Sequence, residues 1–178
     1  MKVLNFGSMN YDYVYQVDHI LTEGETSAAF SMERHLGGKG LNQSIALAKA
    51  GIPVMHAGLI GEDGQAILDL CKKYGVDTSY VRQISGKCGH TILQVDSHAQ
   101  NSILLYGGSN RMQTTAYMDE VLQSFQQGDY LLLQNEINHL DYLIDRAFDA
   151  GMKIILNPSP FDEALYQCDL TKIDCFIL

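Results

Sequence analysis

Gly37-Gly38-Lys39-Gly40-Leu41-Asn42-Gln43-Ser44 is a glycine-rich turn that runs directly into a predicted helix. Glycines at such a point let the backbone approach a ligand closely, because no Cβ stands in the way. They also leave unpaired N–H groups at the positive end of the helix dipole, which suits an oxygen-rich or anionic group. Asn42 lies one turn into the helix and can offer a donor and an acceptor to a hydroxyl. A tight turn that caps the helix without binding a ligand is the alternative interpretation.

Two well-known phosphate-binding loops do not account for this stretch. A Walker loop has the pattern G-x-x-x-x-G-K-[ST], but Glu33 stands in place of its first glycine and Gly40 in place of its Ser or Thr. The dinucleotide fingerprint G-x-G-x-x-G fits only in part, because Gln43 occupies the position of its third glycine. The stretch also follows an extended segment well inside the chain, whereas the fingerprint follows the first strand.

Predicted strands and helices alternate on both sides of the glycine-rich turn. Short apolar runs predict buried strands at residues 3–7, 54–60, 130–134 and 153–157. Apolar residues at helical spacing predict helices at residues 40–50, 64–74, 117–125 and 140–150. This alternation predicts an α/β fold with a doubly wound, mostly parallel sheet. The last run, from Asp174 to Leu178, is also typical of a buried strand, whereas natural chain ends tend to be polar.

Several extended segments do not fit this alternation and predict a small sheet that projects from the main one. Tyr11, Tyr13 and Tyr15 fall on one face of a strand, because side chains alternate with a period of two. The segments 90–95 and 102–106 are separated by a polar turn, as in a hairpin.

The composition is typical of a soluble globular protein and argues against several functions. A length of 178 residues suits one domain. The formal net charge of −9 argues against a nucleic-acid or anionic-membrane partner, since both need a positive footprint. No apolar run approaches the roughly 18–20 residues that span a bilayer, and the N-terminus does not resemble a secretion signal. The four cysteines lack C-x-x-C spacing, so we expect reduced thiols, no zinc site and a cytoplasmic location.

Four motifs together resemble those of the ribokinase-like (phosphofructokinase-B) sugar kinases. The glycine-rich stretch, followed by Gly51 and Gly61, is similar to the first signature of the family, and G-G-K-G-x-N-Q is most similar to its ribokinase branch. The other three motifs, G-S-x-N-x-D, G-x-D-x-G and N-P-x-P, are matched by Gly7-Ser8-Met9-Asn10-Tyr11-Asp12, Gly61-Glu62-Asp63-Gly64 and Asn157-Pro158-Ser159-Pro160. The matches keep the order of the family between residues 7 and 160.

The resemblance implies a sugar site and a reaction. The implied reaction transfers the γ-phosphate of ATP to the primary hydroxyl of a pentose, converting D-ribose to ribose 5-phosphate, with Mg²⁺ and possible K⁺ dependence. The implied sugar-binding residues are Asn10, Tyr11, Asp12, Gly38, Lys39, Gly40, Leu41, Asn42 and Glu136. Asn157 is expected to form a turn, and residues 107–110 to form a hinge or the edge of the site.

Three of these assignments have alternatives that the residues leave open. Asp12 also suits a solvated turn aspartate, and Lys39 a solvated lysine. Glu136 also suits a carboxylate at a helix start near Asn138.

The resemblance also implies a lid over the sugar that pairs with the lid of a second subunit in a homodimer. The lid comprises segments at about 11–18, 27–36, 89–96 and 101–107, including the tyrosine face, inserted into one substrate-binding domain at 1–178. An internally packed sheet is the alternative for these segments.

The residues that would carry out phosphoryl transfer are not found in the sequence. Such transfer needs a base near the acceptor hydroxyl and neutralisation of charge on the phosphates. The family supplies these through a G-A-G-D signature and an N-x-x-E element, and neither occurs here. We therefore expect a missing C-terminal part, with no catalytic base in this chain, a base that lies beyond Leu178, and no turnover by the chain alone.

Other functions remain as alternatives. They are a non-catalytic sugar-binding or regulatory module and a kinase for a nucleoside or another sugar. A nicotinamide-dependent oxidoreductase is disfavoured by the incomplete dinucleotide fingerprint.

Overall fold

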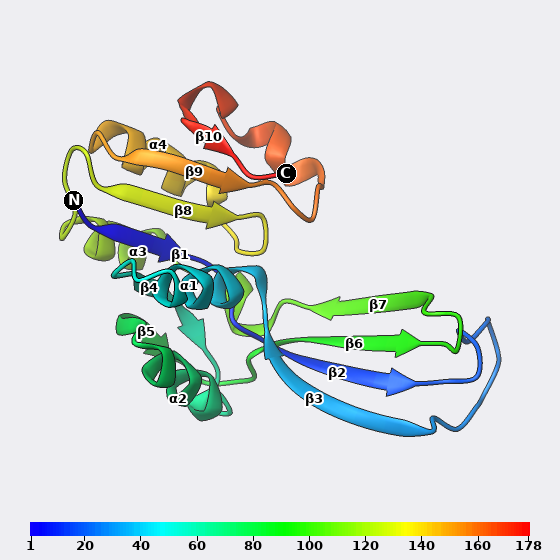
Figure 1. Ribbon diagram of the computed structural model, residues 1–178. Helices are drawn as coiled ribbons and strands as arrows, with labels where there is room; N and C mark the ends of the chain where they lie inside the picture. Colours follow the sequence, from blue (N-terminus) through cyan, green and yellow to red (C-terminus); the bar gives the residue numbers. More distant parts are fainter.

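The apolar runs of the sequence form a six-stranded parallel sheet in the computed structural model, which describes residues 1–178 (Figure 1). The strand order is β10-β9-β8-β1-β4-β5, and every neighbouring pair is parallel. The strands are β1 (Val3–Phe6), β4 (Met55–Ile60), β5 (Asp77–Gln83), β8 (Tyr130–Gln134), β9 (Lys153–Asn157) and β10 (Cys175–Phe176). The predicted α/β fold with a mostly parallel sheet is confirmed.

Helices cover both faces of this main sheet. They are α1 (Lys39–Lys49), α2 (Gln65–Tyr74), α3 (Thr115–Leu122) and α4 (Leu140–Asp149), with 3₁₀ turns η1 (Gly108–Arg111), η2 (Glu163–Gln167) and η3 (Leu170–Lys172). One buried cluster of 21 residues joins the sheet to α3 and α4, and a second cluster of 9 joins it to α1 and α2. No helix combines the length and the apolar character needed to cross a membrane.

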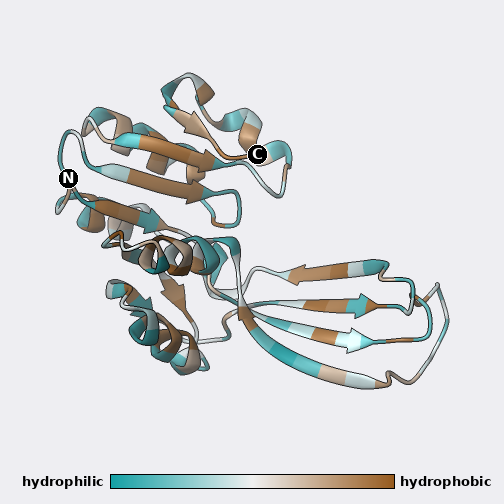
Figure 2. Ribbon diagram, in the orientation of Figure 1, coloured by the Kyte–Doolittle hydropathy of each residue, from teal (hydrophilic) through white to brown (hydrophobic).

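A four-stranded sheet projects from the main body and is called here the projecting sheet (Figure 1). Its order is β3-β2-β6-β7, formed by β2 (Asn10–Gln16), β3 (Ser31–Gly37), β6 (Gly89–Val95) and β7 (Asn101–Tyr106). The central pair β2–β6 is parallel, and the two outer pairs are antiparallel. Figure 2 shows hydrophobic residues on β6 and β7, whereas β3 is mostly hydrophilic.

The structure differs from the sequence expectations in β5 and β3. The strand β5 (Asp77–Gln83) was not expected, because its sequence is mostly polar and, as the edge of the main sheet, it has no fully buried residue. The extended segment predicted at 27–36 begins as a strand only at Ser31.

The apolar run that ends at Leu178 forms only a short strand in the 178 residues described. Only Cys175 and Phe176 form a strand there, and both are exposed. Within these 178 residues β10 is the outermost strand of the main sheet and pairs with β9 alone. Leu178 itself is fully exposed and belongs to no strand.

Candidate functional site

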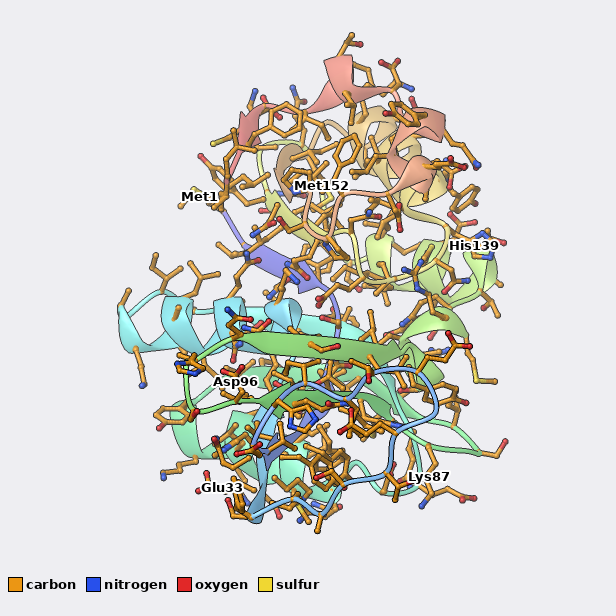
Figure 3. The ribbon with its side chains drawn as sticks, turned by 90° about the vertical axis from the view of Figure 1, so that its right-hand side faces the viewer. Met1, Glu33, Lys87, Asp96, His139 and Met152 are labelled. Carbon is orange, nitrogen blue, oxygen red and sulfur yellow. The ribbon has the colours of Figure 1, made fainter.

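A cavity of about 470 Å³ lies where the projecting sheet meets the carboxyl ends of the main-sheet strands. Ligands of open α/β sheets bind at this end of the strands. The cavity is lined by Asn10, Asp12, Gly38, Lys39, Asn42, Thr91, Leu93, Ile103, Leu105, Glu136 and Pro160. Figure 3 looks along the projecting sheet toward the main body, with Glu33 and Asp96 labelled on the sheet and Met152 and His139 on the body.

Two loops converge on the cavity because glycines let them approach closely. The amide of Leu41 donates to the Ser8 carbonyl at 2.9 Å, which joins the first turn of α1 to the connection between β1 and β2. A Cβ on Gly40 would lie 2.5 Å from the Ser8 nitrogen, so only glycine fits there. Gly38 has a φ of +94°, which also favours glycine. The first-strand loop and the glycine-rich turn, which both carry residues expected in the sugar site, therefore lie side by side.

Glu136 lies just beyond β8 and accepts hydrogen bonds from the glycine-rich turn. The amide of Lys39 donates to its Oε2 at 3.0 Å, and the Lys39 ammonium donates to its Oε1 at 2.7 Å. The hydroxyl of Ser8 donates to Oε2 as well. The Glu136 side chain is 9% exposed and that of Lys39 is 37% exposed. Neither is a freely solvated group, and Glu136 precedes the start of α4 by four positions.

Asn10 and Asp12 project from the start of β2 into the same cavity. The Asn10 side-chain oxygen accepts from the Asn110 amide at 2.6 Å, which leaves the Asn10 amide nitrogen without a partner in the protein. Asp12 Oδ1 accepts from the hydroxyl of Thr91 at 2.6 Å. A Cβ on Gly37 would lie 1.9 Å from Asp12 Oδ2, so the carboxylate rests against a backbone that has no side chain. Asn110 belongs to the segment 107–110 that was expected to form a hinge or the edge of the site; it contacts Asn10 but does not itself line the cavity.

Three residues that sequence reasoning assigned to the sugar site do not line the cavity. Tyr11 is 3% exposed and lies on the opposite face of β2, where its hydroxyl donates to the Asp63 carbonyl at 2.5 Å. Burial raises the pKa of Tyr11. Leu41 is fully buried in the core, and Gly40 is buried behind Ser8. The cavity therefore faces the side of β2 that carries Asp12, and the expected tyrosine face lies on the other side of the sheet.

The end of the chain adds no side chain to the cavity. Neither β10 nor Leu178 is among the residues that line it. The expectation of a catalytic base beyond Leu178 stays a prediction.

Sequence reasoning missed several residues of the site. Ser8 and Pro160 were expected only as members of motifs, and none of the lid residues that line the cavity was assigned to the sugar site; these are Thr91, Leu93, Ile103 and Leu105. Alternation along the predicted strands placed the residues of β6 and β7 on two faces, but only the register between strands shows which face meets Asp12.

Asn157 accepts from the Ser159 amide at 2.9 Å and forms the turn expected of it.

A network of buried hydrogen bonds joins α1 to strands β1 and β4. The Asn5 amide donates to the Gly40 carbonyl at 2.7 Å and to the Ser44 hydroxyl oxygen at 2.8 Å. Ser44 Oγ lies 2.8 Å from His56 Nδ1, and His56 Nε2 lies 3.3 Å from the Gly7 carbonyl. Burial lowers the pKa of His56 to about 4, so the ring is neutral near pH 7. The bond to a carbonyl requires a proton on Nε2, which makes Nδ1 the acceptor for Ser44.

The acidic and sulfur side chains of the chain do not assemble a metal site. No group of three or more His, Cys, Asp or Glu side chains is arranged to hold a metal ion. The cavity instead offers single carboxylates, amides and one ammonium, which are groups that bind hydroxyls.

Comparison with known proteins gives one family and several individual matches. Residues 1–173 match the pfkB family of carbohydrate kinases. The ribokinase of Bacillus subtilis (strain 168) is 34% identical over 158 residues, covering 86% of this chain and 54% of that protein. The chain spans about half the length of the curated relatives it matches.

Two solved structures are similar over most of this chain. The Cryptococcus neoformans var. grubii serotype A ribokinase in complex with ADP has a TM-score of 0.81 at 28% identity, covering 98% of this chain and 55% of that one. The Arabidopsis thaliana ribokinase complexed with ribose and ATP has a TM-score of 0.76 at 29% identity, covering 89% of this chain and 53% of that one.

Proposed function

The chain belongs to the pfkB family of carbohydrate kinases, and from this premise we propose that it forms the sugar-binding part of a kinase for a pentose, D-ribose. The supporting observation is that six of the nine expected sugar-site residues line one cavity. These are Asn10, Asp12, Gly38, Lys39, Asn42 and Glu136. A volume of about 470 Å³ is within the usual range for small-molecule sites.

The chemistry of the lining suits a polyol with one apolar face. Asp12 and Glu136 supply acceptors, and the amides of Asn10 and Asn42 supply donors for sugar hydroxyls. Leu93 and its neighbours on β7 supply an apolar wall from the projecting sheet, against which the C–H groups of a sugar ring can pack. The same wall would keep water from the bound sugar.

The proposed reaction transfers the γ-phosphate of ATP to the primary hydroxyl of the sugar. Bound Mg²⁺ neutralises phosphate charge in such transfers, and a monovalent cation such as K⁺ is a further proposed requirement. The residues of this chain do not fit that part of the reaction, because they form no metal site and contain neither the G-A-G-D nor the N-x-x-E element. The chain would bind and orient the sugar, and the base would lie outside these residues. We therefore propose that the chain alone does not turn over.

The projecting sheet is proposed to act as the lid of the site and as a dimer contact. Ile103 and Leu105 on β7 line the cavity on the side of the projecting sheet, although they are 56% and 42% exposed. Leu104, on the other face of the same edge strand, is 67% exposed. An exposed apolar edge strand favours pairing with another chain, and a second copy is the proposed partner.

Calorimetric titration of the purified chain with D-ribose, D-fructose and adenosine tests the sugar site. We expect D-ribose to bind and Asp12→Asn to weaken binding at least about 10-fold, because a charged acceptor of hydroxyl protons is lost. Asp18→Asn is the matched control, since this side chain is 77% exposed and lies outside the cavity. Absence of sugar binding, or equal binding by Asp12→Asn and wild type, would refute the proposal.

Turnover assays distinguish the remaining functions. Phosphorylation by these 178 residues with Mg-ATP would contradict the proposal that the base lies elsewhere. Preference for adenosine over D-ribose would identify a nucleoside kinase. Sugar binding without turnover by the protein of natural length would identify a non-catalytic module.

A further inference from the structure

Thr91 lies in the wall of the cavity and bonds directly to the carboxylate of Asp12. The two residues are direct partners in the parallel register of β2 and β6, and both line the cavity. Thr91 is 9% exposed, and its Oγ1 donates to Asp12 Oδ1 at 2.6 Å. Sequence motifs gave no sign of this contact, because the two residues are 79 positions apart.

This contact fixes what the two side chains can offer to a ligand. A threonine hydroxyl has one proton, and that of Thr91 is committed to Asp12. An ionised aspartate has acceptors only. Asp12 Oδ2 and the lone pairs of Thr91 Oγ1 therefore form a corner of the cavity that contains acceptors and no donor. Gly37 leaves room for this orientation of the carboxylate, because a Cβ there would lie 1.9 Å from Oδ2.

We propose that Thr91 is a specificity-determining residue, and that it and Asp12 together select a sugar with two adjacent hydroxyl groups, both of which donate. This inference rests on the proposed function, because it takes the cavity to be a sugar site. In a pentofuranose whose primary hydroxyl receives the phosphate, the adjacent hydroxyl pairs are 1,2 and 2,3. Both pairs contain the 2-hydroxyl, so the site selects D-ribose over 2-deoxy-D-ribose.

The site discriminates against 2-deoxy-D-ribose because this sugar leaves one acceptor of the corner without a donor. When 2-deoxy-D-ribose binds, one acceptor of the corner loses its water and gains no donor, which is expected to weaken binding roughly 10-fold. Thr91→Val keeps the shape of the side chain and removes the hydroxyl. The proposal places the 2-hydroxyl on Thr91 Oγ1 and the neighbouring hydroxyl on Asp12 Oδ2. Thr91→Val therefore removes a contact that D-ribose makes and 2-deoxy-D-ribose does not, so D-ribose affinity falls by about 5-fold or more while 2-deoxy-D-ribose affinity stays nearly constant.

Titration calorimetry of the purified chain with both sugars tests the inference. The proteins compared are wild type, Thr91→Val, Thr91→Ser and the control Thr78→Val, which changes a threonine of the distant strand β5. Wild type is expected to prefer D-ribose about 10-fold, Thr91→Val to lose most of that preference, and Thr91→Ser to retain it within about 2-fold. Urea unfolding establishes that each variant is folded, and Thr91→Ala replaces Thr91→Val if the valine variant is not.

The outcomes separate this inference from the proposed function. If wild type binds no pentose, both fail. If wild type binds D-ribose and 2-deoxy-D-ribose equally, or if Thr91→Val weakens both sugars by the same factor, the sugar site stands and the role of Thr91 is refuted. The inference is supported only if Thr91→Val lowers the ratio of D-ribose affinity to 2-deoxy-D-ribose affinity and Thr91→Ser retains that ratio. A purely structural role of Thr91 would not distinguish the two sugars.

Discussion

The buried ring of His56 predicts a loss of stability in mild acid. The ring is fully buried, and burial lowers its pKa to about 4 from an ordinary value of 6.5. Between these two pH values the unfolded chain binds a proton that the folded chain does not bind. Stability from this group is therefore complete above about pH 6.5 and declines as the pH falls toward 4.

The size of the effect follows from the two pKa values. A shift of about 2.5 units corresponds to about 3 kcal/mol when the decline is complete. Between pH 7 and pH 5 the same two values give a decline of about 2 kcal/mol. This interval is informative because unfolded aspartates and glutamates titrate mainly below it.

Urea unfolding followed by circular dichroism at pH 7, 6 and 5 measures this decline, since the chain has no tryptophan to report by fluorescence. The reference is the double variant Ser44→Ala with His56→Leu, which removes both partners of the Ser44–His56 bond. The Asn5 amide and the Gly7 carbonyl each lose one partner, but neither group titrates between pH 5 and pH 7, so this loss does not alter the pH dependence. Wild type is expected to lose about 2 kcal/mol more than the double variant between pH 7 and pH 5. Equal pH dependence of the two proteins would refute the assignment of a neutral buried ring.

Three substitutions test other parts of the site and the fold. Gly40→Ala is expected to lower the free energy of unfolding by about 1–3 kcal/mol and to weaken sugar binding, because the new Cβ would lie 2.5 Å from the Ser8 nitrogen; unchanged calorimetric and urea curves would contradict this. Glu136→Gln is expected to weaken D-ribose binding roughly 10-fold in calorimetry, since it removes the charge that pairs with the glycine-rich turn; equal affinity would contradict this. Asp129→Ala is expected to lower the free energy of unfolding by about 2 kcal/mol with sugar affinity unchanged, because its carboxylate accepts from the Lys2 amide at 2.7 Å far from the cavity. The Lys2 amide lowers the pKa of Asp129, so the stabilisation by this carboxylate is present above pH 3.8 and is lost as the pH falls through the lowered pKa. Equal urea midpoints for wild type and Asp129→Ala at pH 7 would contradict the prediction.

The main sheet and the first turn of α1 could be predicted from the sequence because both depend on local patterns. Apolar runs indicated the central strands, and the glycines at 37–40 marked the approach of backbone to backbone. The edge strand β5 could not be predicted in this way, because it is exposed and has no apolar run. Tyr11 was assigned to the site because it stands between two site residues, although alternation along β2 already put it on the other face.

The apolar run at residues 174–178 shows the same dependence of burial on strand order. The run that ends at Leu178 is apolar enough for a buried strand, yet its residues are exposed. Hydropathy alone does not show whether a strand has a neighbour on each side, and β10 has only β9. Burial at the two edges of the main sheet therefore depends on strand order, which no local pattern encodes.

The contacts of Thr91 and His56 could not be predicted, because they depend on distant pairings. Thr91 meets Asp12 only through the register of β2 and β6. His56 stands in an otherwise apolar strand, where its sequence context does not indicate a partner. Ser44 supplies that partner from a helix, 12 positions earlier in the chain.

The hydrogen-bond partners of Asp12 and Glu136, two residues of the proposed sugar site, all lie within this chain. Glu136 is held by Lys39 and Ser8, and Asp12 is held by Thr91. These contacts are formed entirely among residues 1–178, with no ligand bound. Sugar affinity should therefore be measurable in these 178 residues even though turnover is not expected of them. If sugar binding required residues outside these 178, the hydrogen bonds of Asp12 and Glu136 would be insufficient to hold the proposed site, and all of the affinity predictions would fail together.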